Sequence, residues 1–119
     1  MIENQKSKAY DLERRTFQFA SRVNEYVVRL PKIITNIENG KQLIRSAGSV
    51  GANWIEATES LSKKDFLMRV KICRKEVKES AYWLSLTVPD QKDQSEKDAL
   101  VQEATELRKI FGAIVTRSS

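Results

Sequence analysis

Hydrophobic residues recur every three or four positions over four long stretches of this chain, as in helices that bury one face. The stretches predict four helices, over residues 11–30, 40–60, 62–88 and 96–117. No strand-like alternation competes with them. Pro31 and Pro89 end the first and third helices, because proline disfavours helical geometry in the residue before it. Short connections place consecutive helices side by side, so the expected fold is all-α, an antiparallel up-down-up-down four-helix bundle.

The ends and the buried face of two helices follow from the same pattern. Ser62 is expected to cap the third helix, with Asp65 three residues later. In this helix the inward positions extend to Val88. In the second helix the apolar stripe comprises Leu43, Ile44, Ala47, Val50, Gly51, Trp54, Ile55, Thr58 and Leu61.

Two glycines, Gly48 and Gly51, lie inside the second predicted helix, where each costs about 1 kcal/mol relative to alanine. At 100° per residue, Gly51 falls within the apolar stripe and Gly48 at its margin, with Trp54 near the centre. Small residues there would let a neighbouring helix approach closely, and close packing would offset the propensity cost. Glycines that are merely tolerated, or a break in the helix, are the alternatives.

Length and composition indicate one domain over residues 1–119, with residues 1–10 as a flexible N-terminal segment. No stretch approaches the ~20 apolar residues of a membrane span, so no membrane association is expected. The N-terminus has no apolar core of signal-peptide type, and the single cysteine excludes an internal disulfide. These features predict a cytoplasmic protein.

Candidate catalytic chemistry is sparse. The chain has no histidine, which removes the usual general base and metal ligand, and no glycine-rich phosphate loop. Two carboxylate pairs, Glu56 with Glu59 and Glu76 with Glu79, suggest a metal site, but wheel positions place all four away from the main apolar stripes. Salt bridges or an interface explain them better, and Cys73 fits a small core residue better than a nucleophile. The sequence therefore predicts a non-enzyme without catalytic residues, cofactor or metal.

The charge balance favours a polyanionic partner. Twenty-one basic against sixteen acidic residues give a net charge of +5. One side of the third helix forms a basic flank of Lys63, Lys64, Lys71, Arg74, Lys75 and Lys78. An arginine row on the first helix consists of Arg15, Arg22 and Arg29. Such rows can neutralise phosphates; the alternative is a solvated flank that pairs with acids of neighbouring helices.

The third helix also carries a second apolar stripe, nearly opposite its core stripe. This outer stripe consists of Met68, Ile72, Trp83 and Leu86, with Glu76 and Glu79 beside it. A second apolar face suggests a partner surface, where the two glutamates would pair with a basic group such as Arg45 of a neighbouring copy. The alternatives are a helix unusually buried in its own bundle, or Trp83 folding back over the core.

Two motifs carry a family resemblance. The segment "RSAGSVGANWIEA" resembles the signature of the four-helix-bundle proteins encoded in intervening sequences of bacterial 23S ribosomal RNA genes. The matching residues are Ser49, Asn53, Glu56 and Ala57, although glycine is usual at position 57, and a proline or small residue is usual where Gly51 stands. The segment "DFLMRVKICRKEVKESAYWLSL" is similar to the family's third-helix pattern, through Glu76, Glu79, Tyr82, Trp83 and Leu84.

The resemblance implies an antiparallel bundle that assembles as a homo-oligomer, with a ring-like pentamer as the leading expectation, and no established enzymatic activity. A related branch serves as accessory protein of diversity-generating retroelements and associates with reverse transcriptase and RNA. Two hypotheses follow for this chain: an RNA-associated homo-oligomer, or an oligomeric scaffold or accessory factor for another protein without direct nucleic-acid binding. An enzyme is the third and most distant.

Overall fold

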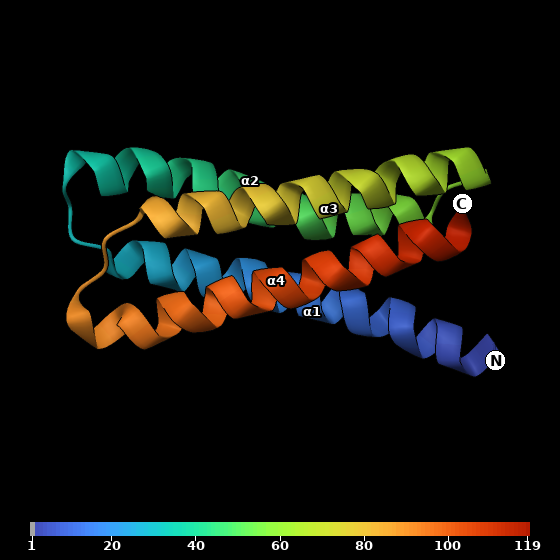
Figure 1. The fold of residues 1–119 in the computed structure, drawn as a ribbon, viewed down its shortest axis with the longest axis horizontal. Coiled ribbons are helices and arrows are strands. Elements are labelled where there is room, and N and C mark those ends of the chain that lie inside the picture. Colours follow the sequence, from blue (N-terminus) through green and yellow to red (C-terminus); the bar gives the residue numbers. More distant parts are fainter. Residues whose placement is uncertain (1) are drawn as a thin grey trace.

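The structure is a computed structural model that describes the backbone of residues 2–119 and the side chains of residues 11–119. Four helices run alternately along one axis and form an antiparallel bundle of 46 × 22 × 19 Å (Figure 1). They are α1 (Ile2–Arg29), α2 (Ile34–Thr58), α3 (Lys63–Leu86) and α4 (Gln94–Ser118), and a 3-10 turn, η1 (Gln91–Asp93), precedes α4. The all-α four-helix bundle expected from the sequence is confirmed.

Three expected helix limits are wrong. α1 begins at Ile2 rather than at residue 11. The side chains of residues 1–10 lie outside the described part, so the expected flexibility of this segment stays a prediction. α2 begins at Ile34 rather than at residue 40, because its first turns bury Asn36 and Gly40, which give no hydrophobic signal. α3 ends at Leu86, and Thr87 is already extended at φ −76° and ψ 149°.

The start of α3 is as expected. The backbone N–H of Asp65 donates to the Ser62 hydroxyl over 3.1 Å, which satisfies one of the free donors at the helix N-terminus. No helix in the described part of the chain is long and apolar enough to cross a membrane.

The core runs the length of the bundle and takes side chains from all four helices. Its largest fully buried members are Phe19, Tyr26, Leu43, Leu84, Leu100, Leu107 and Phe111. Trp54 lies among them, with its ring 6.2 Å from Phe66 and 5.9 Å from Phe111 between centroids. The expected stripe is wrong at five positions, which are exposed: Ile44, Ile55, Thr58, Leu61 and Val88.

The exposed positions have two causes. α2 has ended before Leu61, and α3 before Val88, so the helical wheel no longer applies to them. Ile44, Ile55 and Thr58 lie within α2, on a side that no other helix covers fully, and Ile44 and Ile55 remain 42% and 48% exposed.

Gly51 lies where the backbone of α2 packs closely on a side chain of α1. A Cβ atom at this position would lie 3.0 Å from Thr16 Oγ1 and 3.3 Å from Thr16 Cβ, tighter than ordinary van der Waals contact. At Gly48 the same atom would meet nothing within 4 Å. The close-packing hypothesis therefore holds for Gly51 and is wrong for Gly48.

Asn36 joins the two connections at the end of the bundle where α2 begins. Its buried side-chain amide donates to the carbonyls of Pro31 over 3.0 Å and Val88 over 2.9 Å. Its Oδ1 accepts from the Val88 N–H over 2.9 Å. The polar side chain is thus satisfied by backbone groups from both connections, α1–α2 and α3–α4.

Candidate nucleic-acid interface

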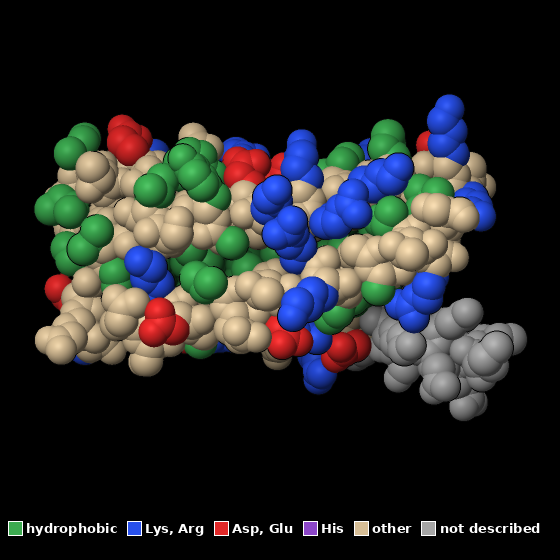
Figure 2. Space-filling view, viewed as in Figure 1, with side chains coloured by type: hydrophobic (Ala, Val, Ile, Leu, Met, Phe, Trp, Pro, Cys, Tyr) green, Lys and Arg blue, Asp and Glu red, His purple; other side chains and the backbone are tan. Residues whose placement is uncertain are grey.

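The basic flank of α3 is exposed to solvent. Its five lysines are exposed and Arg74 is half-buried. Figure 2 shows basic side chains gathered over α3 and along its border with α4. Only one of the six, Lys75, has an ion-pair partner among the described side chains, at 3.8 Å from Glu76. The expected alternative, pairing with acids of neighbouring helices, is not seen for the other five in residues 11–119.

The basic surface continues onto α4 through a residue that the sequence did not indicate. The aliphatic part of Arg74 lies beside Gly112 of α4, with Cδ 4.0 Å from the position of a Cβ. Arg108 is exposed one turn before Gly112 on the same side of α4. Arg108 joins the basic surface only through the register of α4 against α3. The spacing of residues within one helix therefore could not predict it.

The arginine row of α1 lies on a different side, at the seam with α4. Arg15 makes two hydrogen bonds to Glu103, of 2.7 and 3.0 Å, and Arg22 makes two to Glu96, of 2.9 and 3.2 Å. These hydrogen bonds raise the pKa of both guanidinium groups. Arg29 makes a single hydrogen bond of 3.2 Å, to Asp93 of η1 at the N-cap of α4. The row therefore holds α1 against α4, and its charges are compensated within the chain.

Arg45 forms an ion cluster with two glutamates of α3. Its guanidinium lies 3.5 Å from Glu76 Oε2 and also pairs with Glu79. The expected pairing of Arg45 with a neighbouring copy is therefore wrong, since both partners belong to the same chain. The outward position expected for Glu76 is also wrong: the residue is 6% exposed, because α2 covers this side of α3.

The outer stripe of α3 does not form one continuous surface. Trp83 packs partly against the core, and its indole N–H donates to Glu79 over 3.1 Å. Ile72 is half-buried, which leaves Met68 and Leu86 as the members that are 48% and 42% exposed. These two lie 18 residues apart, which is about 27 Å along a helix.

The motif residues of α2 link α2 to α3. The side-chain amide of Asn53 donates to the carbonyl and hydroxyl oxygens of Ser49, over 2.9 and 3.0 Å. Its Oδ1 accepts a 3.1 Å hydrogen bond from Arg69 of α3. Ala57 is buried and Glu56 is exposed. Ser49 and Asn53 thus have a structural role in holding the two helices together.

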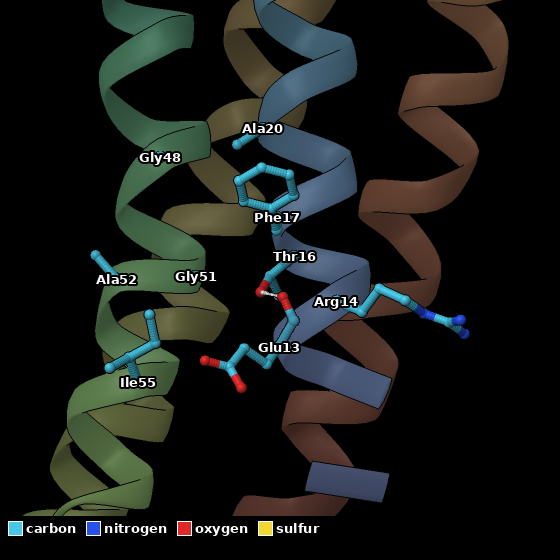
Figure 3. A pocket seen from close by; sticks show the side chains of 9 residues that line it. All are labelled: Glu13, Arg14, Thr16, Phe17, Ala20, Gly48, Gly51, Ala52 and Ile55. Atoms are coloured by element: carbon cyan, nitrogen blue, oxygen red, sulfur yellow. Dashed lines mark hydrogen bonds between the residues drawn. The ribbon is translucent and has the colours of Figure 1, made fainter. Parts of the chain in front are cut away.

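A shallow groove of about 450 Å³ separates α1 from α2 (Figure 3). Phe17 and Ile55 stand beside it, while Gly48, Gly51 and Ala52 leave its α2 side without bulk. No titratable cluster of catalytic type lines this groove. In the described part of the chain no group of three or more Cys, Asp or Glu is arranged to hold a metal ion.

Cys73 has the properties of a core residue. Its side chain is fully buried and its thiol donates to the Val50 carbonyl at 3.4 Å. Burial raises the pKa of the thiol to about 12. The nucleophilic thiolate is therefore suppressed at neutral pH.

The fold and the exposed flank define the class: an all-α, antiparallel four-helix bundle with a cationic face. A family model described as 23S rRNA-intervening sequence protein matches residues 8–113, and the chain belongs to this family. The solved structure of a Bacteroides thetaiotaomicron protein with unknown function, from the S23 ribosomal protein family, is similar at 26% identity. The similarity covers 92% of this chain and 98% of that one, with a TM-score of 0.76. A comparison with curated proteins finds no match.

Proposed function

We propose that this protein is a non-enzymatic, homo-oligomeric RNA-associated protein whose basic flank on α3 contacts phosphates. The observation that carries the proposal is the contrast between two sets of cations. The arginine row of α1 is compensated by acids of η1 and α4, whereas five of the six flank cations have no ion-pair partner among the described side chains. Unpaired, exposed cations on one face release counterions when they meet a polyanion.

RNA is the polyanion that the family description favours, because it refers to the intervening sequences of 23S rRNA. Few neutral hydrogen-bonding side chains stand between the flank cations, so we expect phosphate contacts with little base readout. A homo-oligomer would repeat the flank in each copy, and weak contacts would add through multivalency.

The test compares two charge-matched triple variants. Lys71→Glu, Arg74→Glu and Lys78→Glu together should lower affinity for mixed-sequence RNA on the order of 10- to 100-fold at ~50 mM salt. The slope of log affinity against log salt should flatten by about two, because three phosphate contacts are lost. Fluorescence anisotropy at several salt concentrations measures both quantities.

The control triple changes exposed lysines elsewhere on the surface, Lys32→Glu, Lys41→Glu and Lys92→Glu, and shifts the net charge equally. It should bind RNA much more tightly than the flank triple. Equal losses in both triples would contradict a flank-specific contact. Because Arg74 packs on α4, the exposed pair Lys71→Glu and Lys78→Glu repeats the test without this contact.

A protein-interaction scaffold is the second candidate, and the exposed apolar side chains favour it. Phe17, Val28 and Ile34 are each more than 70% exposed. Absence of RNA binding by the parent protein at ~50 mM salt would favour this function over the first.

A further inference from the structure

α1 and α4 diverge towards the end of the bundle where α4 finishes (Figure 1). A cleft of about 950 Å³ opens there. Its apolar lining comprises Leu12, Trp54, Phe66, Ile110, Ala113 and Ile114. Two exposed cations, Lys109 and Arg117, also line it, and neither has an ion-pair partner among the described side chains. The lining includes one acid, Asp11, which pairs with Arg14 at 3.1 Å.

The distribution of charge along α4 explains why the seam opens. Ion pairs to the arginine row hold α1 against the first half of α4 and reach as far as the pair between Arg15 and Glu103. Beyond this pair α4 has one more acid, Glu106, and then only cations: Arg108, Lys109 and Arg117. After Glu106, α4 therefore has no acid to offer α1, and on the described lining of the cleft two cations stand against one acid, Asp11.

The α2–α3 turn at the same end of the bundle has the complementary character. This tip, residues 59–61, carries Leu61, whose side chain is fully exposed at 101%, and the exposed Glu59. Glu59 caps the C-terminus of α2, whose last turn contains no base. An acid at this position is unfavourable, since a helix C-terminus carries partial negative charge. Among the described side chains Glu59 has no ion-pair partner.

We propose that the tip of one copy docks in the α1/α4 cleft of a second copy, with Leu61 on the apolar lining and Glu59 beside Lys109 and Arg117. Charge complementarity selects this occupant: Glu59, the one charged residue of the tip, is opposite in sign to Lys109 and Arg117, while Lys63 and Lys64 lie just beyond the tip on α3. Because Leu61 is fully exposed, the tip does not cover the cleft of its own chain. The contact joins two different surfaces: made once per pair of copies it repeats head to tail and closes into a ring or extends, and made reciprocally it gives a twofold dimer. This proposal rests on the homo-oligomer of the proposed function and identifies the two surfaces that join its copies.

The experiment measures mass in solution by light scattering at tens of micromolar protomer. Leu61→Asp and Glu59→Lys should each shift the parent oligomer towards the monomer, with association at least tenfold weaker and the helical circular dichroism unchanged. Lys109→Glu should do the same. The double variant Glu59→Lys with Lys109→Glu restores opposite charges across the contact and should recover the parent mass.

Controls of matched chemistry lie far from the tip and the cleft. Val28→Asp places an acid at another exposed apolar residue, and Glu25→Lys makes the same change of charge on α1. Both should keep the parent mass. A monomeric parent would overturn the homo-oligomer and the contact together. An oligomeric parent whose mass survives Leu61→Asp and Glu59→Lys would overturn the contact alone, and a double variant that stays dissociated would overturn the pairing of Glu59 with Lys109.

Discussion

Gly51 and Gly48 offer a matched pair of substitutions, because the two glycines share one helix and differ in what lies beyond them. An alanine Cβ at position 51 would sit 3.0 Å from Thr16 Oγ1, while at position 48 it would meet nothing within 4 Å. Thr16 cannot yield easily, since it is buried, β-branched, and donates to the Leu12 carbonyl over 2.7 Å.

The expected magnitudes follow from two opposing effects. Gly→Ala in a helix interior gains about 1 kcal/mol of stability, and Gly48→Ala should show this gain in full. At position 51 the overpacking against Thr16 costs about 2 kcal/mol, so Gly51→Ala should lose about 1 kcal/mol net. Gly51→Leu makes the same Cβ contact with Thr16 and should lose at least as much.

Chemical denaturation and thermal unfolding measure these differences, at one protomer concentration because assembly contributes to stability. The two alanine variants should differ by about 2 kcal/mol, or about 8 °C in Tm. In a Thr16→Ala background the penalty at position 51 should shrink, with a coupling energy of about 1–2 kcal/mol. Equal stabilisation by Gly48→Ala and Gly51→Ala would refute the close contact.

Two further predictions concern buried titratable groups. Arg45→Met removes the guanidinium from the buried Glu76 carboxylate and should lower the free energy of unfolding by about 2 kcal/mol in urea titrations; adding Glu76→Gln should recover part of the loss, and no recovery would argue against a charge effect. The Cys73 thiol should react with an alkylating reagent only on unfolding, and because the fold raises its pKa to about 12, its contribution to stability should be complete below pH ~8.5 and decline at higher pH. Rapid alkylation of the native protein, or the same pH dependence in Cys73→Ser, would contradict this.

Most of the fold could be predicted from the sequence, because each helix has an apolar stripe that faces the core and prolines follow the first and third helices. The prediction failed where burial does not depend on apolar side chains. Asn36 and Gly40 are buried in the first turns of α2, so the hydrophobic pattern began too late there. The helical-wheel prediction for α3 placed Glu76 outward, on the assumption that the main apolar stripe is the buried side of the helix. α2 and α4 both pack on α3, and Glu76 is buried as a result.

The candidate interface was predictable only in part. Spacing alone identified both basic rows, since residues on one helix face recur at a fixed period. It could not say which row is compensated, because the acids that pair with Arg15 and Arg22 lie far away in the sequence, on α4. The same reason hid Arg108, which extends the basic surface only through the register of α4 against α3.

The buried amide of Asn36 makes the two connections at one end of the bundle depend on each other. The Val88 N–H is held by a side chain from another helix, so it can exchange its proton with solvent only when the start of α2 moves away. That movement also releases the Pro31 and Val88 carbonyls, whose only described side-chain donor is the same amide. We therefore expect the segments around Pro31 and Val88 to open together in native-state hydrogen exchange, although the Pro31 carbonyl also accepts from the Ile33 N–H over 2.9 Å. Local fluctuations at this end involve both turns at once, and neither turn behaves as an independent loop.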